Sequence, residues 1–357
     1  MTKTMQKLMI SAAITTCMTA AAAAENWYPY PVEVWDPPFN MESPRSTMDY
    51  QPLPAASKPW EICVSFPHMK DAYWLGVDYG VAQEAERLGV KMQLVEAGGY
   101  TELNNQISQI EDCVAAGANA VIIGAISFDG LNNIVKEISD KGIPVIDVIN
   151  GMSSSDLSAK SLVSFGEMGG KAGAFLAELH PSGGEKAKVA WFPGPAGAGW
   201  VEAGNTGFTG AIEGSAVDLV DTKYGDTGKE AQAKLVEDTL EAHPDLDYVV
   251  GTAVTAEAAI PILRARGLTD QVKVVSYYYT PGVDQGIRRK QILAAPTDSP
   301  VIQGRIAVDQ AVRILEGEPF QKHVGPALKI VTQDNLADFD PSSTLAPSGF
   351  KPVFRVN

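Results

Sequence analysis

The sequence predicts an α/β fold made of two similar lobes, each a doubly wound parallel sheet, joined by a hinge. From about residue 59 onward, short runs of Val, Ile and Leu alternate with segments of helical length, which is typical of βαβ units in a parallel sheet. The alternation comes as two series that divide near Gly166. The chain of 357 residues is long enough for two lobes with separate cores.

The first series ends before Gly166. Its predicted strands are short apolar runs, and polar segments with helical periodicity separate them. Crossovers between parallel strands are right-handed, so we expect the connecting helices on both faces of the sheet. The predicted strands are 60–66, 91–97, 120–124 and 144–148, and the predicted helices are about 72–88, about 101–116 and one that ends near 141.

The second series repeats this pattern and then leads to a closing segment. Its predicted strands are 188–192, about 217–222, 248–251 and 272–276, with helices at about 168–180, 201–213, 229–242 and 256–266. A helix near 281–289, a strand at 292–295, a helix at 301–315 and a last strand at 327–332 follow. The repetition indicates two lobes of the same kind.

Two segments precede the alternation. Residues 1–24 carry Lys3 and Lys7, then an apolar stretch and an alanine run, which predicts a cleaved secretory signal peptide rather than a membrane anchor. Residues 25–58 are rich in proline and aromatic residues without helical or strand periodicity, so we expect an extended arm. The arm docks either on its own protein or on a partner.

Charge and motifs exclude several functions. The formal net charge of −15 becomes more negative when the leader and its two lysines are removed, and it argues against nucleic acid as a partner. The glycine-rich stretch 193–199 matches neither a Walker A loop nor a dinucleotide fingerprint. The four histidines are scattered, and no nucleophile elbow or metal-ligand spacing occurs. We therefore expect no enzyme, no cofactor and no metal.

Two cysteines remain after removal of the leader. Cys63 lies in the first predicted strand and Cys113 in the second predicted helix. An even number of cysteines in an exported protein permits a disulfide, and two separate buried thiols are the alternative. Both interpretations stay open.

The start of the first predicted helix carries two adjacent aromatic residues, Tyr73 and Trp74. This helix follows a strand, and open α/β sheets bind ligands at the carboxyl ends of their strands. Aromatic and acidic residues there, in place of glycines, favour a receptor pocket over a phosphate site.

The order of elements resembles the type I periplasmic binding proteins, and segments 69–74, 117–124 and 142–146 carry the likeness. The resemblance implies a periplasmic location and two lobes that close on a ligand, with crossovers near Phe165, Ala295 and Gly325. It assigns residues 59–165 and about 296–325 to the N-terminal lobe, and residues 166–295 and about 326–357 to the C-terminal lobe.

A narrower resemblance is to the TorT family, which are periplasmic receptors for trimethylamine N-oxide that signal to the sensor domain of the TorS histidine kinase. It rests on residues 69–75, 95–100, 193–195, 250–253, 256–259 and 348–353. It implies trimethylamine N-oxide as the ligand and a TorS-like histidine kinase as the partner. The implied ligand contacts are Asp71, Trp74, Tyr100, Phe165 and Tyr278, with Tyr73 beside them. Asp298 stands where related binding proteins present a polar group.

These residue types suit that ligand. Aromatic faces attract methyl groups on a positive nitrogen, and a tyrosine hydroxyl at Tyr100 or Tyr278 can donate to the N-oxide oxygen. Asp71 can face the nitrogen. The family has tryptophan where this chain has Phe165, which keeps a π face and loses area. Trp200 is either a residue that closes over the pocket or a surface tryptophan.

Three other functions remain as alternatives. The first is an ABC-transporter substrate-binding protein for a sugar or a small quaternary amine. Apart from Asp147, Asn150 and Asp298, few Asn, Asp, Arg and Gln side chains stand at the predicted strand ends, which argues against a sugar. An exported α/β enzyme would turn a ligand over, and a ligand-free structural partner of a kinase would bind no small amine oxide.

Overall fold

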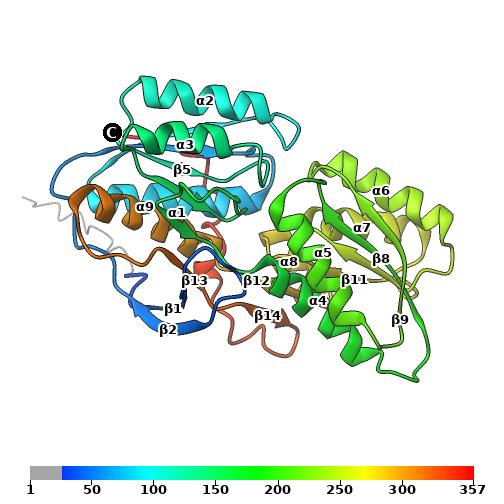
Figure 1. The fold of residues 1–357 in the computed structure, drawn as a ribbon. Helices are drawn as coiled ribbons and strands as arrows, with labels where there is room; N and C mark the ends of the chain where they lie inside the picture. The colour runs from blue at the N-terminus through cyan, green and yellow to red at the C-terminus, as the bar shows by residue number, and fades with distance from the viewer. Residues whose placement is uncertain (1–25) are drawn as a thin grey trace, which may run out of the picture.

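The structure is a computed structural model, and it describes residues 26–357. The predicted signal peptide lies outside the described residues. Figure 1 shows two α/β lobes side by side, with β12 and β14 between them. Among residues 26–357, no helix has the length and apolar character needed to cross a membrane.

The first lobe is built on a nine-stranded sheet. Its central strands are parallel, and residues such as those of β5 are buried along their whole length, as expected for strands covered by helices on both faces. The outer pairs β1–β13, β1–β2 and β15–β4 are antiparallel. The order is β15 (Arg355–Val356), β4 (Lys91–Glu96), β3 (Glu61–Phe66), β5 (Ala120–Ile123), β6 (Val145–Val148), β7 (Ala159–Ser161), β13 (His323–Pro326), β1 (Tyr30–Trp35) and β2 (Arg45–Tyr50).

Four helices cover this sheet: α1 (Ala72–Leu88), α2 (Leu103–Ala115), α3 (Asn132–Asp140) and α9 (Pro300–Glu316). The first begins at an Asp71 cap, whose side chain accepts the backbone N–H groups of Tyr73 and Trp74. It ends at Gly89, which has a φ of 75°. Its Gly80 approaches α9 so closely that a Cβ there would stand 2.1 Å from the carbonyl oxygen of Val301.

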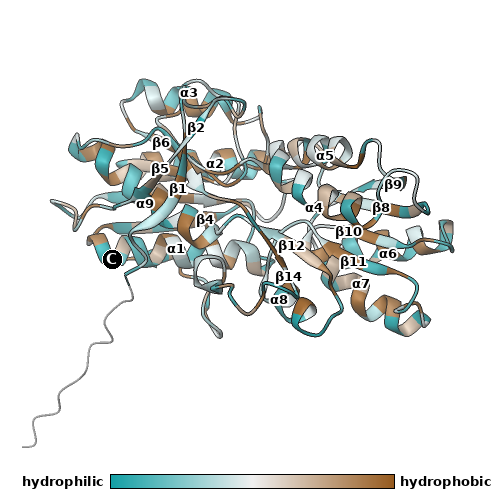
Figure 2. Cartoon of the chain, turned by 90° about the horizontal axis from the view of Figure 1, so that it is seen from below, coloured by the Kyte–Doolittle hydropathy of each residue, from teal (hydrophilic) through white to brown (hydrophobic). Residues whose placement is uncertain are grey.

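The second lobe has a smaller parallel sheet in the order β11 (Lys273–Ser276), β10 (Tyr248–Gly251), β8 (Ala187–Gly194) and β9 (Val217–Tyr224). Its helices are α4 (Phe165–Leu179), α5 (Gly199–Ile212), α6 (Lys229–Ala242), α7 (Ala253–Arg266) and α8 (Pro281–Arg288). In Figure 2 the outer helices α6 and α7 carry both hydrophilic and hydrophobic segments, as expected when one face of a helix covers a sheet. The predicted two-lobed α/β fold is therefore observed.

The chain passes between the lobes at residues 162–164, 298–299 and 327–328, and it returns to the first lobe after β14, before its last strand pairs with β4. Two antiparallel strands, β12 (Ala294–Thr297) and β14 (Lys329–Thr332), form a separate ribbon at this junction. Such multiple short connections permit a hinge movement while they keep the lobes aligned.

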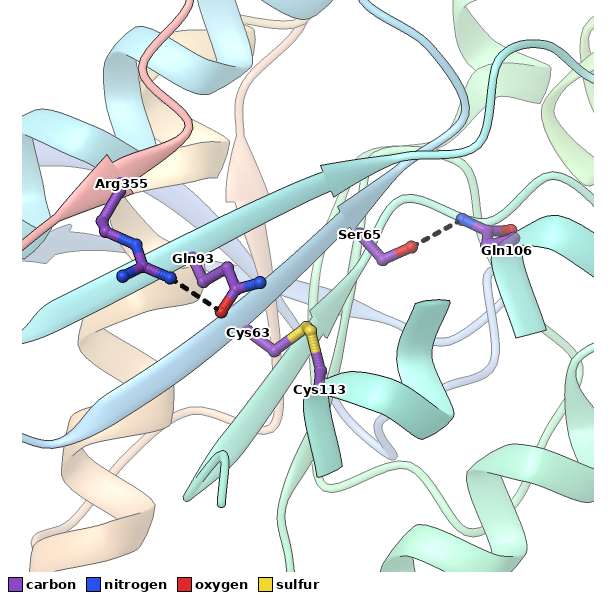
Figure 3. The surroundings of a disulfide bond; sticks show 6 residues. All are labelled: Cys63, Ser65, Gln93, Gln106, Cys113 and Arg355. Carbon is purple, nitrogen blue, oxygen red and sulfur yellow. Dashed lines mark hydrogen bonds between the residues drawn. A yellow bond between two sulfur atoms is a disulfide. The ribbon is translucent and has the colours of Figure 1, made fainter. Parts of the chain in front are cut away.

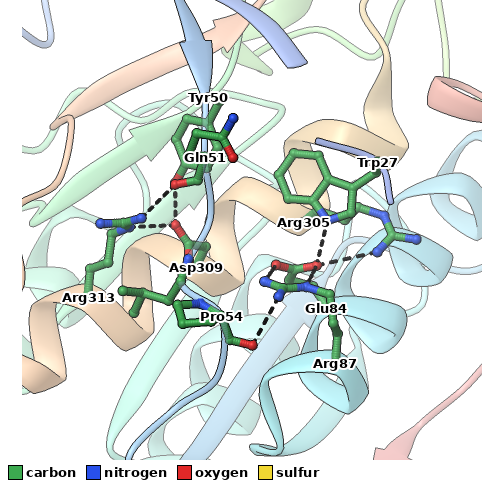
Figure 4. A network of polar contacts seen from close by, with 10 residues as sticks. Trp27, Tyr50, Gln51, Pro54, Glu84, Arg87, Arg305, Asp309 and Arg313 are labelled. Carbon is green, nitrogen blue, oxygen red and sulfur yellow. Dashed lines mark hydrogen bonds and ion pairs between the residues drawn. The ribbon is translucent and has the colours of Figure 1, made fainter. Parts of the chain in front are cut away.

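The predicted arm, which the structure describes from residue 26 to residue 58, docks on its own protein. It contains β1 and β2, a hairpin that extends the first sheet at β13. The sequence did not indicate these strands because β2 is exposed at all but its last residue, so its sequence shows no buried-exposed alternation. Figure 4 shows how the arm is held: the Trp27 indole donates to Glu84, and the Tyr50 hydroxyl donates to Asp309.

The C-terminal segment corrects the predicted lobe boundary. The sequence assigned about 326–357 to the C-terminal lobe, but β15 pairs with β4 of the first sheet, and the Val353 N–H donates to Asp78 of α1. The short helix η1 (Pro341–Ser343) also contacts α9. A strand of only two residues leaves no pattern in the sequence, so its pairing was not predictable.

A disulfide joins Cys63 of β3 to Cys113 of α2, whose Cα atoms are 6.0 Å apart (Figure 3). Of the two interpretations left open by the sequence, the structure has the bonded one. Both residues are buried, and they pack with Ile110 and Val121 in a core on the α2–α3 side of the sheet. The bond therefore fastens a helix to the strand that leads to Asp71.

Candidate ligand-binding cleft

A small cavity of about 20 Å³ lies between the lobes. Its walls come from the carboxyl ends of strands in both sheets: β3, β4 and β6 in the first lobe, and β8, β9 and β11 in the second. This is where an open parallel sheet binds its ligand. The lining residues are Asp71, Tyr73, Trp74, Tyr100, Asn150, Phe165, Trp200, Thr227 and Tyr278.

Aromatic rings make most of the wall, and they meet across the two lobes. The ring centroids of Tyr73 and Tyr278 are 5.1 Å apart, edge to face. Trp200 lies 6.1 Å from Tyr100 and 6.0 Å from Phe165. Trp74 and Trp200 are only 2% and 4% exposed. The rings thus close the cavity to solvent on most sides. We call the set of lining rings the aromatic cage.

The Tyr100 hydroxyl is fixed by a hydrogen bond to its oxygen, so its proton remains available for donation. The Asn150 amide donates to the Tyr100 hydroxyl oxygen at 2.9 Å and to the Ala125 carbonyl at 2.8 Å. Burial raises the pKa of Tyr100 well above its ordinary value, so the hydroxyl stays protonated at neutral pH. Because its oxygen already accepts a hydrogen bond, its proton can point to an acceptor in the cavity.

Asp71 is the acidic group of the cage. Its carboxylate accepts the N–H groups of Tyr73 and Trp74 at 3.1 and 3.2 Å, which fixes it at the start of α1. The pKa of Asp71 rises from 3.8 to about 7, mainly because of burial; the two N–H bonds oppose this rise, and the nearby charges of Glu257 and Asp226 add to it. A positive group in the cavity would favour the ionised carboxylate.

Asp298 does not line the cavity, although the sequence predicted a ligand contact there. The residue is fully buried behind Tyr73, whose hydroxyl donates to Asp298 Oδ2 at 2.6 Å. Gln303 donates to the same oxygen at 2.7 Å. Asp298 therefore orients a cage ring and has no direct access to a ligand, because Tyr73 stands between.

Contacts across the cleft hold the lobes together. The His68 imidazole and the Thr227 hydroxyl are 2.9 Å apart, and Lys70 lies 3.9 Å from Asp226. Burial lowers the pKa of His68 to about 4, so this contact involves a neutral imidazole at neutral pH. Residues of the two lobes are thus in direct contact around the cage, so the lobes are in a closed arrangement.

The structure brings the predicted residues Asp71, Tyr73, Trp74, Tyr100, Phe165 and Tyr278 to one cavity. It adds Trp200, Asn150 and Thr227. For Trp200 the sequence left two interpretations open, a residue that closes over the pocket and a surface tryptophan; the structure buries it in the cavity wall, in the first turn of α5. The sequence signal that could have identified Trp200 as a site residue is an aromatic side chain in the first helical turn after a strand, as at Tyr73 and Trp74.

Nothing in the described part of the chain suggests a metal centre: no group of three or more His, Cys, Asp or Glu side chains between residues 26 and 357 stands close enough to hold an ion. The lining of the cage offers aromatic rings, one carboxyl group and a few neutral hydrogen-bonding groups. Such groups suit methyl groups and a hydrogen-bond acceptor.

The chain matches a family model described as a periplasmic binding protein domain over residues 62–319. It belongs to the periplasmic binding protein family. The predicted type I fold is confirmed, and the family is one of ligand-binding proteins of the periplasm. Periplasmic protein TorT of Escherichia coli is 35% identical over 299 residues, which cover 84% of this chain and 85% of TorT.

Two solved structures of relatives extend the comparison. One is an ABC transporter solute-binding protein from a Bradyrhizobium species with bound bis-tris, 63% identical, with a TM-score of 0.80, covering 93% of this binding protein and 100% of that chain. The other is the TorS sensor domain–TorT complex in the presence of trimethylamine N-oxide, 37% identical, with a TM-score of 0.76, covering 83% and 99%.

Proposed function

We propose that this protein is a periplasmic receptor that binds trimethylamine N-oxide in the aromatic cage and signals to a membrane sensor histidine kinase. One observation carries the ligand: a cavity of about 20 Å³, walled by aromatic rings of both lobes, contains a hydroxyl whose proton is free. The closed cage has room for about one water-sized group, so its rings must move apart to enclose the five non-hydrogen atoms of trimethylamine N-oxide.

Each part of the ligand has a counterpart in the cage. The rings of Trp74, Phe165 and Tyr278 face the methyl groups, whose partial positive charge is attracted to aromatic faces. Tyr100 donates to the N-oxide oxygen, and Asp71 faces the positive nitrogen. Phe165 offers less area than the tryptophan of the TorT family, and Trp200 supplies an additional face beside it at 6.0 Å.

The partner is inferred from the relatives and from the closed cleft. TorT, a 37% identical relative, has been solved with the TorS sensor domain. A ligand that contacts both lobes binds the closed arrangement better than an open one and so shifts the population toward it. A kinase sensor domain that contacts both lobes would detect this shift.

Isothermal titration of the purified mature protein with trimethylamine N-oxide, trimethylamine, choline and ribose tests the ligand. We expect binding of the N-oxide in preference to the other three, and loss of binding in Trp74→Ala. Tyr224→Ala is the matched control, because Tyr224 is exposed and lies outside the cage. If the N-oxide does not bind, or if Trp74→Ala binds it as well as the unaltered protein, the ligand assignment is wrong.

A separate titration tests the partner. The periplasmic domain of a TorS-like histidine kinase is added to the mature protein with and without saturating trimethylamine N-oxide. We expect a complex whose affinity depends on the ligand. If no complex forms in either condition, the proposed kinase partner is wrong, whereas the ligand assignment is unaffected.

A second candidate function is that of an ABC-transporter solute-binding protein for a small quaternary or tertiary amine. It is favoured by the 63% identity to the Bradyrhizobium solute-binding protein that holds bis-tris, an amine with hydroxylated arms. Binding of bis-tris or choline more tightly than trimethylamine N-oxide, together with no kinase complex, would support this alternative.

A further inference from the structure

A second and larger cavity, of about 450 Å³, lies directly against the aromatic cage. It shares three wall residues with the cage: Asn150, Phe165 and Trp200. We call it the side chamber. Its other walls include Phe39 and Met41 of the arm, Met152, Leu162 and Val163 of the first lobe and hinge, and Ala203 of α5. Trimethylamine N-oxide bound in the cage leaves it unfilled.

The side chamber is suited to an apolar group. Its one lysine, Lys160, does not present a free charge: the ammonium donates to the Met152 carbonyl at 2.6 Å and lies 3.3 Å from buried Asp147. The remaining wall is mostly aliphatic and aromatic, as in pockets that bind apolar parts of small molecules. Burial of alkyl groups there would be favourable because it removes them from water.

Trp200 and Phe165 form the partition between the two cavities. The Trp200 ring stacks near Tyr277, with centroids 6.0 Å apart and planes at 20°. Its Nε1 is buried close to the Tyr100 hydroxyl but makes no hydrogen bond of good geometry, whereas a buried indole N–H usually has a partner. Packing, and not a hydrogen bond of good geometry, therefore holds the indole in the partition, and the arm of a ligand has to displace it to pass from the cage into the side chamber.

We propose that the site also binds methylated amine N-oxides that carry an alkyl arm, with the N-oxide head in the cage and the arm in the side chamber. This inference rests on the proposed function and widens its ligand class. A dimethyl N-oxide head keeps the contacts with Trp74, Tyr100 and Asp71, and the third substituent passes beside Trp200. The chamber has room for an arm of several carbons.

The test compares trimethylamine N-oxide with N,N-dimethylbutylamine N-oxide by isothermal titration. The unaltered protein is expected to bind both ligands. Ala203→Phe fills the chamber from α5, and Met41→Trp fills it from the arm on the opposite side. Each is expected to keep the affinity for trimethylamine N-oxide and to weaken the butyl ligand by about tenfold or more, equivalent to about 1.4 kcal/mol. Ala203→Ser is the matched control and should change neither affinity.

Several outcomes decide the matter. If the unaltered protein binds trimethylamine N-oxide but not the butyl ligand, the side chamber is not a subsite, although the proposed function stands. Equal weakening of both ligands, or of neither, in the two filled variants overturns the inference as well. If the butyl ligand binds and the filled variants lose it while trimethylamine N-oxide does not bind at all, the chamber is supported and the proposed ligand is wrong. Binding of neither ligand overturns both proposals.

Discussion

Two side chains that are far apart in the sequence cooperate to make an oriented donor in the cage. Asn150 follows β6 and Tyr100 follows β4, and the amide of the first fixes the hydroxyl oxygen of the second at 2.9 Å. A fixed donor recognises an N-oxide oxygen without the entropic cost of ordering a free side chain. In the proposed complex this arrangement would distinguish an amine oxide from an amine without the oxygen.

Tyr100→Phe removes the donor while it keeps the ring. We expect the affinity for trimethylamine N-oxide to fall by about 1.5–3 kcal/mol, the range for a hydrogen bond to a charged acceptor, and the affinity for trimethylamine to change little. Isothermal titration measures both. Tyr248→Phe is the control, because the Tyr248 hydroxyl contacts His180 in the second lobe, outside the cage. Equal affinity of Tyr100→Phe and the unaltered protein would contradict the assigned donor.

Asp71 makes binding dependent on pH. Burial raises its pKa from 3.8 to about 7, and a ligand with a positive nitrogen favours the ionised form. The affinity for trimethylamine N-oxide should therefore rise by about threefold to tenfold between pH 6 and 8, as linkage requires. Of the groups facing the cleft, His68 is already neutral in this range, while Glu257, whose pKa burial also raises, acts in the same direction.

Asp71→Asn identifies the group responsible, since asparagine is also a good helix cap. Its binding should be weaker and should vary less with pH; an unchanged pH profile would exclude Asp71. The stability of the ligand-free protein should change with pH in the opposite direction to the affinity. The folded-state pKa of Asp71 lies above the unfolded value, so its contribution to the free energy of unfolding is complete below about pH 4 and is lost as the pH rises through about 7.

At the scale of elements, the contact between α1 and α9 sets the position of the cage. The first of these helices carries Tyr73 and Trp74 at its start, and α9 follows Asp298, which holds Tyr73. The two helices approach closely at Gly80, where a Cβ would overlap the backbone of Val301. A change in this approach would shift the first-lobe half of the cage.

Gly80→Ala is expected to lower the free energy of unfolding by about 2–3 kcal/mol, because the methyl group overpacks a tight helix contact. Gly210→Ala in α5 is the matched control: no atom lies within 4 Å of a Cβ at that position, and alanine there should stabilise the helix by about 0.5–1 kcal/mol. Urea unfolding measures both. If Gly80→Ala is as stable as the unaltered protein, the close approach of α1 to α9 is not as described.

The arm is an element of the first lobe and not a free tail. Its contacts with Glu84 and Asp309 bury two carboxylates beside Arg87, Arg305 and Arg313 (Figure 4). The tip of its hairpin supplies Phe39 and Met41 to the side chamber. Arg45 also pairs with Glu167 of α4, so the arm touches both lobes beside the candidate site.

At the scale of the whole molecule, the lobes meet through the cage itself. Trp74 and Tyr100 belong to one lobe, and Trp200 and Tyr278 belong to the other, so the cage is complete only in the closed arrangement. A ligand in the cage therefore acts as a bridge. This is the physical basis by which a small molecule would change a surface that a partner protein recognises.

Small-angle X-ray scattering can detect this closure. The radius of gyration of the mature protein is expected to decrease when trimethylamine N-oxide is added, because the ligand shifts the population toward the closed arrangement. Trp74→Ala should show no decrease at the same ligand concentration. An equal radius of gyration with and without bound ligand would show that closure is not coupled to binding.

Much of the fold was predictable from local patterns. The helices 229–242 and 72–88 and the strand 248–251 have the predicted bounds, because burial on one face of a helix or in a central strand leaves a periodic or continuous apolar signal. The strands β1, β2, β7, β13 and β15 were missed. The strands β1, β2 and β15 lie toward the two ends of the sheet and pair with antiparallel neighbours, whereas β7 and β13 are buried inside the sheet but only three and four residues long. Their pairing depends on distant partners rather than on their own residues.

By itself the sequence determined the two α/β lobes, because they depend on local hydrophobic periodicity. It also determined the aromatic character of the strand ends, because this depends only on residue type. Only the tertiary structure decided that Asp298 supports Tyr73, that Asn150 orients Tyr100, and that Trp200 separates the cage from the side chamber. The two hydrogen bonds among these relations join residues 50 and 225 positions apart, and such contacts arise only when distant segments of the chain pack together.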